Sequence, residues 1–289
     1  MVKTATRKAQ HKARIVVIGM IAFHLACFGA IYTDVSWTAV IVAAALYFLR
    51  AFGVTAGFHR LLAHSSYSAS RPVRFLLTFL GSCATQGGPL WWASHHRRHH
   101  RYSEREGDVH SPVQRGFWYA HIGWMWDAVC FSGNYANIKD LHRYPEIRIL
   151  QKGYVFLILA QAAALFGLGA LLNWLNPALG TSGLQMLVWG FFISTVALWH
   201  ATFMVNSVCH LWGTRPNPAG DGSRNNFLVA LLTLGEGWHN NHHRWAYSAR
   251  HGLRWWQLDV TWLGLLLMKQ LRLVRDLRLP ARRVAPART

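Results

Sequence analysis

The distribution of basic residues constrains this chain more than any other feature of its sequence. Neither lysine nor arginine occurs in residues 15–49 or in residues 153–214. The 289-residue chain nevertheless carries 30 lysines and arginines against 11 acidic residues, a formal net charge of +19. Long apolar segments without basic residues are typical of membrane spans and rare in proteins that bind nucleic acid. The pattern predicts an integral membrane protein and argues against nucleic acid as a partner.

Four apolar segments are long enough to cross a bilayer. A helix of about 20 residues, rising about 1.5 Å per residue, matches the hydrocarbon core. We predict an all-α integral membrane fold with four transmembrane helices in two hairpins, over residues 15–32, 37–58, 154–172 and 184–205. Arg50, near the end of the second span, is expected to extend to the lipid headgroups.

The two short connections within the hairpins lack lysine and arginine. The positive-inside rule therefore puts both termini and the middle of the chain in the cytoplasm. We expect a single membrane domain over residues 1–289, with a helical cytoplasmic cap over residues 59–153 and 206–277 and a basic tail over residues 278–289.

Two further helices, the N-terminal apolar run and the cysteines complete the predictions about the fold. Residues 73–90 predict an interfacial or buried helix, and residues 255–273 an amphipathic helix on the cytoplasmic surface. The first apolar run is too long for a signal-peptide core, so we expect it to remain as an anchor. The cysteines are widely spaced, which favours buried thiols over disulfides or thiolate metal sites.

Histidines are concentrated in three boxes on the predicted cytoplasmic side, HxxxxH at residues 59–64 and HxxHH at residues 96–100 and 239–243. Offsets of three and four residues put the imidazoles of an HxxHH box within about 100° on one helix face. His59 and His64 are five residues apart, so we expect a bend or a helix end there. Neutral imidazole binds iron, zinc, copper or nickel, and three boxes exceed what one ion can coordinate. The boxes predict a site for two metal ions.

Other histidines and neighbours have simpler interpretations. Asn206 and His210 are one helical turn apart after the fourth span and offer further ligands. His24 and His200 lie within apolar spans and are interpreted as neutral side chains bonded to a neighbouring helix. Hydrogen-bonded histidines on a solvated surface would explain one box, but not three on the same side of one membrane.

The order of the boxes resembles the membrane fatty acyl desaturase family, closest to its delta-9 type, which includes bacterial members. The resemblance covers most of the chain and is carried by the runs GFHR (57–60), WWASHH (91–96), DVHSP (108–112), NSVCH (206–210) and GEGWH (235–239). It implies a weaker metal contact, through water, from Asn206. It also implies metal-ligand roles for His59, His64, His96, His99, His100, His210, His239, His242 and His243.

His95 does not fit the family's spacing and is left out of the ligand set. Cys209, beside His210, is interpreted as a packing residue. The remaining histidines are interpreted as interfacial groups or as neighbours of the ligands; they are His11, His110, His121, His142 and His251.

The resemblance also implies a reaction: two irons and O₂ introduce a cis double bond, at position 9, into a saturated acyl chain. Zinc can replace iron in purified protein, because imidazole does not select iron strongly. The tail after the last box is too short for a fused haem domain, so we expect a separate ferredoxin-like or cytochrome-type electron donor. Trp92, Trp199 and Phe203 are candidate walls of an apolar tunnel for the chain. The expected location is a bacterial inner membrane.

Two questions stay open at the level of sequence. Animal acyl-CoA desaturases usually carry an Arg-Asp pair before the first HxxHH box, where this chain has Ser94 and His95, so both acyl-CoA and phospholipid-linked chains remain candidates. A membrane hydroxylase or alkane monooxygenase shares a histidine-rich di-iron centre, although its histidine spacing differs. A metal transporter ranks behind both, because it would place ionisable groups along a path through the spans.

Overall fold

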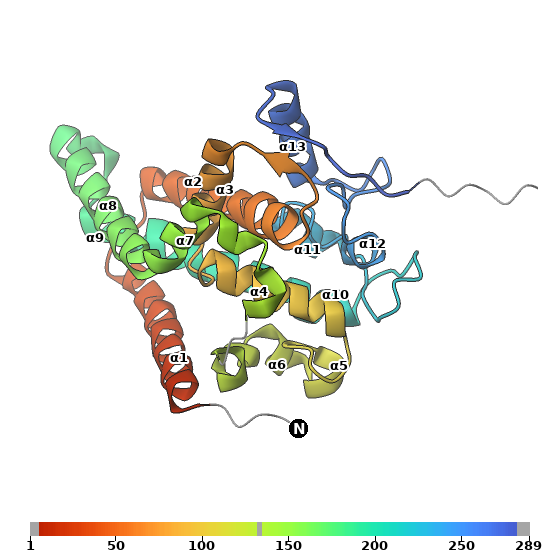
Figure 1. Cartoon of the computed structure of the whole chain (residues 1–289). Helices are drawn as coiled ribbons and strands as arrows, with labels where there is room; N and C mark the ends of the chain where they lie inside the picture. Colours follow the sequence, from red (N-terminus) through yellow and green to blue (C-terminus); the bar gives the residue numbers. More distant parts are fainter. Residues whose placement is uncertain (1–5, 132–134, 282–289) are drawn as a thin grey trace, which may run out of the picture.

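The computed structural model describes residues 6–131 and 135–281, which form a mostly helical molecule (Figure 1). Residues 282–289 of the predicted basic tail lie outside the described residues. The long helical stretches are α1 (Arg7–Cys27) with η1 (Phe28–Ile31), α2 (Trp37–Phe52) with η2 (Gly53–Ala63), α8 (Tyr154–Leu175), and α9 (Gly183–Met186) with η8 (Leu187–Ile193) and α10 (Ser194–Leu211).

Shorter helices connect and cover them. These are α3 (Arg71–Ser82), α4 (Pro89–Tyr102), α5 (Pro112–Arg115), α6 (Phe117–His121), η3 (Gly123–Trp126), η4 (Ala128–Phe131), η5 (Tyr135–Ile138), η6 (Leu141–Arg143), α7 (Pro145–Lys152), η7 (Pro177–Leu179), α11 (Phe227–Leu232), α12 (His239–Arg244) and α13 (Val260–Gln270). Two short strands, β1 (Ser68–Ala69) and β2 (Val274–Arg275), pair antiparallel, with Ser68 opposite Arg275.

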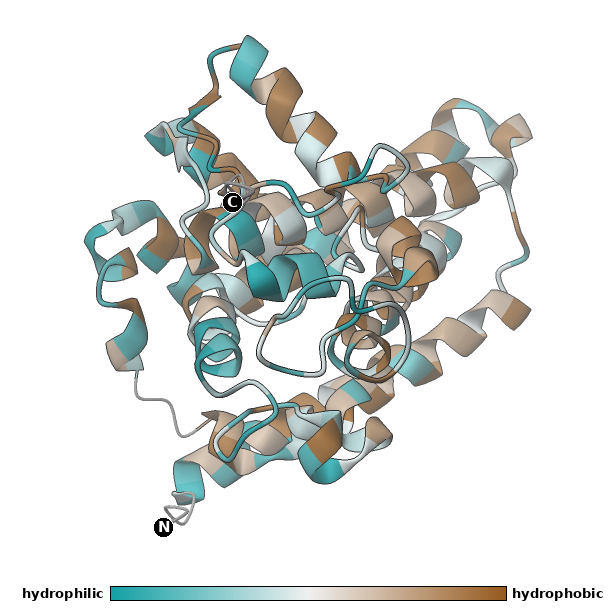
Figure 2. Cartoon of the chain, turned by 90° about the vertical axis from the view of Figure 1, so that its right-hand side faces the viewer, coloured by the Kyte–Doolittle hydropathy of each residue, from teal (hydrophilic) through white to brown (hydrophobic). Residues whose placement is uncertain are grey.

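Four helical stretches of the described chain are long and apolar enough to span a membrane, namely Arg7–Ile31, Trp37–Ala63, Tyr154–Leu175 and Gly183–Leu211. Each overlaps a predicted span and extends beyond it at one end or both, although the first ends at Ile31, one residue before the predicted bound. Hydrophobic residues dominate many of the helices, and hydrophilic residues gather in loops and in some of the helices (Figure 2).

The connections after the first span and before the fourth are tied to each other. The Ser36 hydroxyl caps α2 by accepting from the backbone N–H of Ala39, and it donates to the Gln185 side-chain oxygen at 2.6 Å. The Gln185 amide in turn donates to the Thr33 carbonyl at 2.8 Å. These bonds fix the start of α2 against the start of α9 and η8.

The expectation that Arg50 extends to the lipid headgroups is wrong. Its side chain is 1% exposed and lies against η8 and α10. The guanidinium donates to the Gly190 carbonyl at 2.6 Å, the Ser194 hydroxyl at 2.8 Å and the Thr195 hydroxyl at 2.6 Å. Burial of this cation is tolerable because oxygens of a second helix accept its N–H groups.

The second span ends in a π-helical segment, η2, which packs closely on α3. A Cβ atom at Gly53 would overlap the backbone nitrogen of Gly81, and one at Gly57 would lie 2.6 Å from the Leu77 carbonyl oxygen. Only glycine allows the two backbones to approach so closely. The packing matters for the site because η2 carries His59.

Replacing Gly53 by alanine is expected to destabilise the protein by about 1–3 kcal/mol, the usual cost of forcing an extra carbon into a packed contact. Thermal unfolding in detergent, followed by tryptophan fluorescence, measures the change. Gly167→Ala is the matched control, because a Cβ atom there meets nothing within 4 Å. An equal response of the two variants would contradict the packing argument.

Two predicted cap helices differ from the structure. Residues 73–90 are not one helix, because α3 ends at Ser82 and α4 begins only at Pro89. The predicted amphipathic helix over residues 255–273 is shorter, since α13 starts after Asp259. Asp259 is buried rather than at the surface, because its carboxylate caps α13 and accepts from Arg60 at 2.9 Å.

Candidate metal centre

A π-helical turn aligns the two histidines of the first box, His59 and His64. In η2 the His64 N–H donates to the His59 carbonyl, five residues back, at 3.1 Å. Residues five apart therefore lie one turn apart, which an α-helix does not allow. The His59 and His64 rings face each other with centroids 4.8 Å apart. The helix ends there as predicted, but its π-helical geometry, rather than a bend, aligns the two imidazoles.

Among the described residues, the nine histidines that the resemblance implied as ligands form two groups. We call the one formed by His59, His64, His96, His100 and His242 the first histidine group, and the one formed by His99, His210, His239 and His243 the second histidine group. Within each group, one potential ligand atom per side chain lies within 4.8 Å of the others.

Both HxxHH boxes divide between the two groups. His96 and His100, one helical turn apart on α4, join the first group, and His99 between them joins the second. His239 and His243 on α12 join the second group, while His242 joins the first. Each box therefore contributes to both groups, which holds the two candidate metal positions side by side.

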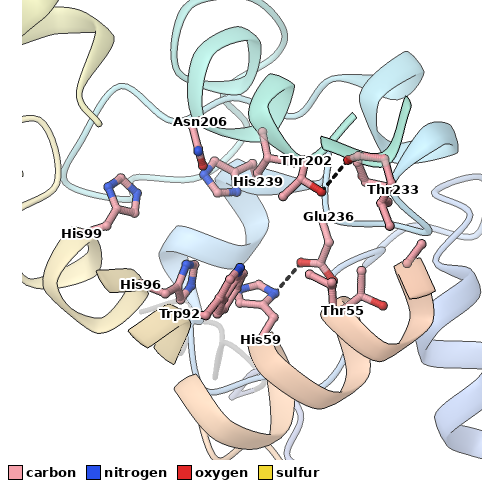
Figure 3. Close-up of a pocket in the computed structure, with 14 residues that line it drawn as sticks. Thr55, His59, Trp92, His96, His99, Thr202, Asn206, Thr233, Glu236 and His239 are labelled. Atoms are coloured by element: carbon pink, nitrogen blue, oxygen red, sulfur yellow. Dashed lines mark hydrogen bonds and ion pairs between the residues drawn. The ribbon is translucent and has the colours of Figure 1, made fainter. Parts of the chain in front are cut away.

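Carboxylates fix the tautomer of several of these imidazoles. A carboxylate accepts from the Nδ1–H group, so the proton is on Nδ1 and Nε2 keeps its lone pair. The pairs are His59 with Glu236 at 2.6 Å, His99 with Asp108 at 2.9 Å, His210 with Glu104 at 2.9 Å and His243 with Asp221 at 2.6 Å. Figure 3 shows the His59–Glu236 pair, with a dashed line joining the imidazole to the carboxylate beside it.

The free lone pairs point at one another, which hydrogen bonding alone does not explain. The Nε2 atoms of His99 and His243 are buried without a hydrogen-bond partner. His242 Nε2 lies 3.1 Å from His59 Nε2 and 2.9 Å from His100 Nε2, although one N–H can serve only one of them well. Nitrogens bound about 2.1 Å from one metal would be about 3 Å apart in an octahedron. The residues present fit two metal ions.

Burial keeps these imidazoles in the neutral form that binds metals. It lowers the pKa of His96 and His100 well below its usual value, and neighbouring imidazoles lower it further. The pKa of His243 falls to about 4, mainly through burial. Burial alone would raise the pKa of Glu236, but His59, His251 and Arg60 hold it well below its usual range. The Glu236 carboxylate is therefore ionised, and the rings of His96, His100 and His243 are neutral at pH 7.

Arg60 holds the Glu236 carboxylate in place by hydrogen bonds, and this carboxylate orients His59. Its guanidinium is fully buried and donates to Glu236 at 3.0 Å and to Asp259 at 2.9 Å. It also donates to the Ala249 carbonyl at 2.7 Å. These bonds link η2, the loop before α12 and the start of α13 around one ligand.

The remaining histidines lie in different places. His110 is buried beside His99 and Asp108, and His251 is buried beside Glu236, so both are neighbours of the two groups. The His95 Nδ1–H donates to the Trp91 carbonyl at 2.8 Å, outside both groups. His11 and His142 are exposed.

The histidines within the candidate spans are hydrogen-bonded to each other. His24 Nε2 lies 3.0 Å from His200 Nε2, as the sequence interpretation expected for side chains that meet a neighbouring helix. His200 Nδ1 lies 3.0 Å from His121 Nε2. His121 is therefore a buried partner of this chain rather than an interfacial group or a neighbour of the ligands. Cys209 is fully buried outside both histidine groups.

Two cavities adjoin the histidine groups. One of about 500 Å³ is lined by His96, Asn206 and all three predicted wall residues, Trp92, Trp199 and Phe203. A smaller one of about 50 Å³ shares Trp92, His96 and Asn206 with it (Figure 3). The ring of Trp92 stacks on His96, with centroids 5.0 Å apart. An apolar ligand in the larger cavity would thus pass directly beside the first histidine group.

Sequence reasoning missed the carboxylates behind the imidazoles. The predicted site consisted of histidines and Asn206, whereas in the structure carboxylates accept hydrogen bonds from the Nδ1–H groups of four of these histidines. Asp108 and Glu236 lie inside the motifs DVHSP and GEGWH. Because the chain has only 11 acidic residues, a carboxylate inside a motif was a usable signal. Glu104 and Asp221 had no local signal, because they reach their histidines from other segments.

Comparison with known proteins finds the same family that the sequence motifs resemble. The profile of the family described as "Fatty acid desaturase" matches residues 35–266. An acyl-CoA C20 Delta5-desaturase of Anemone leveillei is 40% identical over 262 residues, covering 89% of this chain and 79% of that protein. An sn-1 stearoyl-lipid 9-desaturase of Anabaena variabilis is 40% identical over 259 residues, covering 88% and 89%. A chloroplastic palmitoyl-monogalactosyldiacylglycerol delta-7 desaturase of Arabidopsis thaliana is 40% identical over 250 residues, covering 85% and 64%.

Proposed function

The chain belongs to the fatty acid desaturase family, and from this premise we propose that it uses O₂ to introduce a cis double bond at position 9 of a saturated acyl chain. The observation that carries the proposal is the convergence of free Nε2 lone pairs from two histidine groups at one end of a large apolar cavity. Position 9 is supported by the stearoyl-lipid 9-desaturase, whose similarity extends over most of both chains.

The nine histidines of the two groups hold two irons, with Asn206 as a weaker contact. Bound there, the irons supply the oxidising power towards O₂ that no side chain has. In the overall reaction, each of two adjacent CH₂ groups loses one hydrogen, and a double bond forms between the two carbons. These two hydrogens, together with two external electrons and two protons, reduce O₂ to two waters. Glu104, Asp108, Asp221 and Glu236 keep the ligand nitrogens deprotonated and aimed.

The protein's own contribution is to place the chain. Trp92 lies between the two cavities and stacks on His96, so a chain that passes it presents its middle carbons to the first histidine group. Trp199 is fixed as a wall because its indole N–H donates to the Thr85 carbonyl at 3.0 Å. The distance from the cavity mouth to His96 then selects the carbons that react.

The enzyme lies in a bacterial inner membrane, with both hairpins inserted and both termini in the cytoplasm. The absence of lysine and arginine from both hairpin connections supports this orientation. A helical cap formed by α3, α4, α12 and α13 carries the site on the cytoplasmic side. The reaction consumes two electrons per double bond, and a separate small redox protein supplies them.

Expression in a host that lacks its own desaturase tests the function. We expect new monounsaturated chains with the double bond at position 9, mapped by gas chromatography and mass spectrometry of disulfide adducts. A hydroxylated chain would instead support a membrane hydroxylase. If the host makes only saturated chains although the protein has bound iron and a competent electron donor is present, the proposal is contradicted.

A further inference from the structure

The larger cavity reaches from the metal centre to the outer helices. At its inner end it is lined by His96 and Asn206. At its outer end it is lined by Ile15 of α1 and Val155 of α8. Figure 1 shows both helices on the same side of the molecule, at the left.

The outer residues also face away from the protein. Ile15 is 55% exposed and Val155 is 62% exposed. In the apolar windows of α1 and α8 only 6% and 11% of residues are buried, against 44% and 50% for the other two candidate spans. Lipid must cover the exposed faces of such helices. A residue that both faces lipid and lines the cavity marks a place where the cavity meets the lipid.

We propose that the cavity opens sideways into the membrane between α1 and α8, and that the substrate is an acyl chain of a membrane glycerolipid with an anionic headgroup. This inference rests on the proposed function and adds the acyl carrier and the route of entry. The acyl chain moves from the bilayer between α1 and α8 into the cavity without passing through water. The headgroup of the lipid stays at the membrane surface.

Basic side chains occur where that headgroup would lie. Lys12 of α1 and Lys152 of α7 line the same cavity, three residues before Ile15 and three before Val155. They therefore stand at the ends of the apolar segments, at the level of lipid phosphates. The salt bridges of the described residues use arginine and histidine side chains, which leaves both lysines available to a phosphate.

The apolar opening favours a lipid over acyl-CoA. A CoA group is large, highly charged and water-soluble, so an opening between two lipid-facing helices would bring its charges against hydrocarbon. A glycerolipid already holds its chains at this depth and its phosphate at the surface. It therefore needs only lateral movement to reach the cavity.

Gly19 provides a way to close the opening. It lies on α1, lines the cavity, and a Cβ atom there would meet nothing within 4 Å. A leucine at this position would add a bulky side chain at the cavity wall, starting from a Cβ atom that meets no protein atom. Gly167 on α8 is equally free of neighbours but is not among the cavity-lining residues, so Gly167→Leu is the matched control.

The first experiment compares carriers with purified, iron-loaded enzyme and a reductase–ferredoxin donor in vesicles of ether lipids. Deuterated distearoyl phosphatidylglycerol and deuterated stearoyl-CoA are supplied separately, and lipid and CoA products are separated before mass spectrometry. We expect the lipid to react at least about tenfold faster. Conversion of stearoyl-CoA with no conversion of the lipid would overturn the inference and leave the proposed function intact.

The second experiment measures entry without turnover. A phosphatidylglycerol with a diazirine in mid-chain should crosslink to peptides that contain Trp124 or Phe203, which line the cavity. Gly19→Leu should lower both crosslinking and lipid conversion by about tenfold or more, equivalent to about 1.4 kcal/mol, and Gly167→Leu should lower neither. If the lipid probe crosslinks but neither the lipid nor stearoyl-CoA is converted, the result supports the entry route and contradicts the proposed function. Unchanged crosslinking in Gly19→Leu, or none in the wild type, would overturn the route.

Discussion

Replacing His96 by alanine is expected to lower desaturation by more than about 100-fold, since even a residue behind a metal ligand contributes about 10–100-fold. His96 Nε2 lies 2.7 Å from His64 Nε2 in the first histidine group, and its ring also stacks on Trp92. The variant removes one converging nitrogen and part of the wall beside it. Iron per chain should fall together with product formation.

The control for this variant is His142→Ala. His142 is exposed and belongs to neither histidine group, so iron content and product should match the wild type. Thermal unfolding of the apo forms separates loss of metal from loss of fold. Full activity in His96→Ala, with two irons retained, would remove His96 from the proposed ligand set.

Removing the Glu236 carboxylate is expected to lower iron affinity and activity by about 10–100-fold, although Glu236 is not a proposed ligand. Its carboxylate accepts from His59 Nδ1 at 2.6 Å, which keeps the Nε2 lone pair of His59 directed at the first histidine group. Without it, His59 can take the other tautomer, in which Nε2 carries the proton. Iron titration of the apo protein measures the affinity directly.

Two further variants separate the role of Glu236 from a general loss of stability. Glu236→Ala also leaves buried Arg60 with Asp259 as its carboxylate partner, which lowers stability. Glu236→Gln keeps an acceptor for His59, so it should recover part of the iron affinity lost in the alanine variant. The exposed Glu106→Gln is the surface control. Equal iron affinity in Glu236→Ala and the wild type would contradict the positioning role.

The histidine boxes show how far local reasoning reaches. Spacing alone placed the three imidazoles of an HxxHH box on one helix face and implied two metals. It did not assign His99 and His242 to different groups from their neighbours, because that depends on where α4 and α12 lie relative to η2 and α10. An arc of about 100° is wide enough to serve two centres once other helices supply the remaining ligands.

Arg50 and Glu104 show where local reasoning stops. The hydropathy of the second span could not reveal that Arg50 meets Gly190, Ser194 and Thr195 on the fourth, since the partners are more than 100 residues away in sequence. Glu104 likewise reaches His210 across a separation of 106 residues. A buried polar group must be satisfied, but which distant atom satisfies it is set by packing.

The sequence by itself determined the four apolar helices and the three histidine boxes, and it predicted a site for two metal ions, because hydropathy and ligand spacing are local properties of the chain. The tertiary structure alone decided the division of the histidines into two groups, the carboxylates that fix their tautomers and the large cavity beside the first histidine group. Those features depend on contacts between distant segments, which form only when the helices pack together.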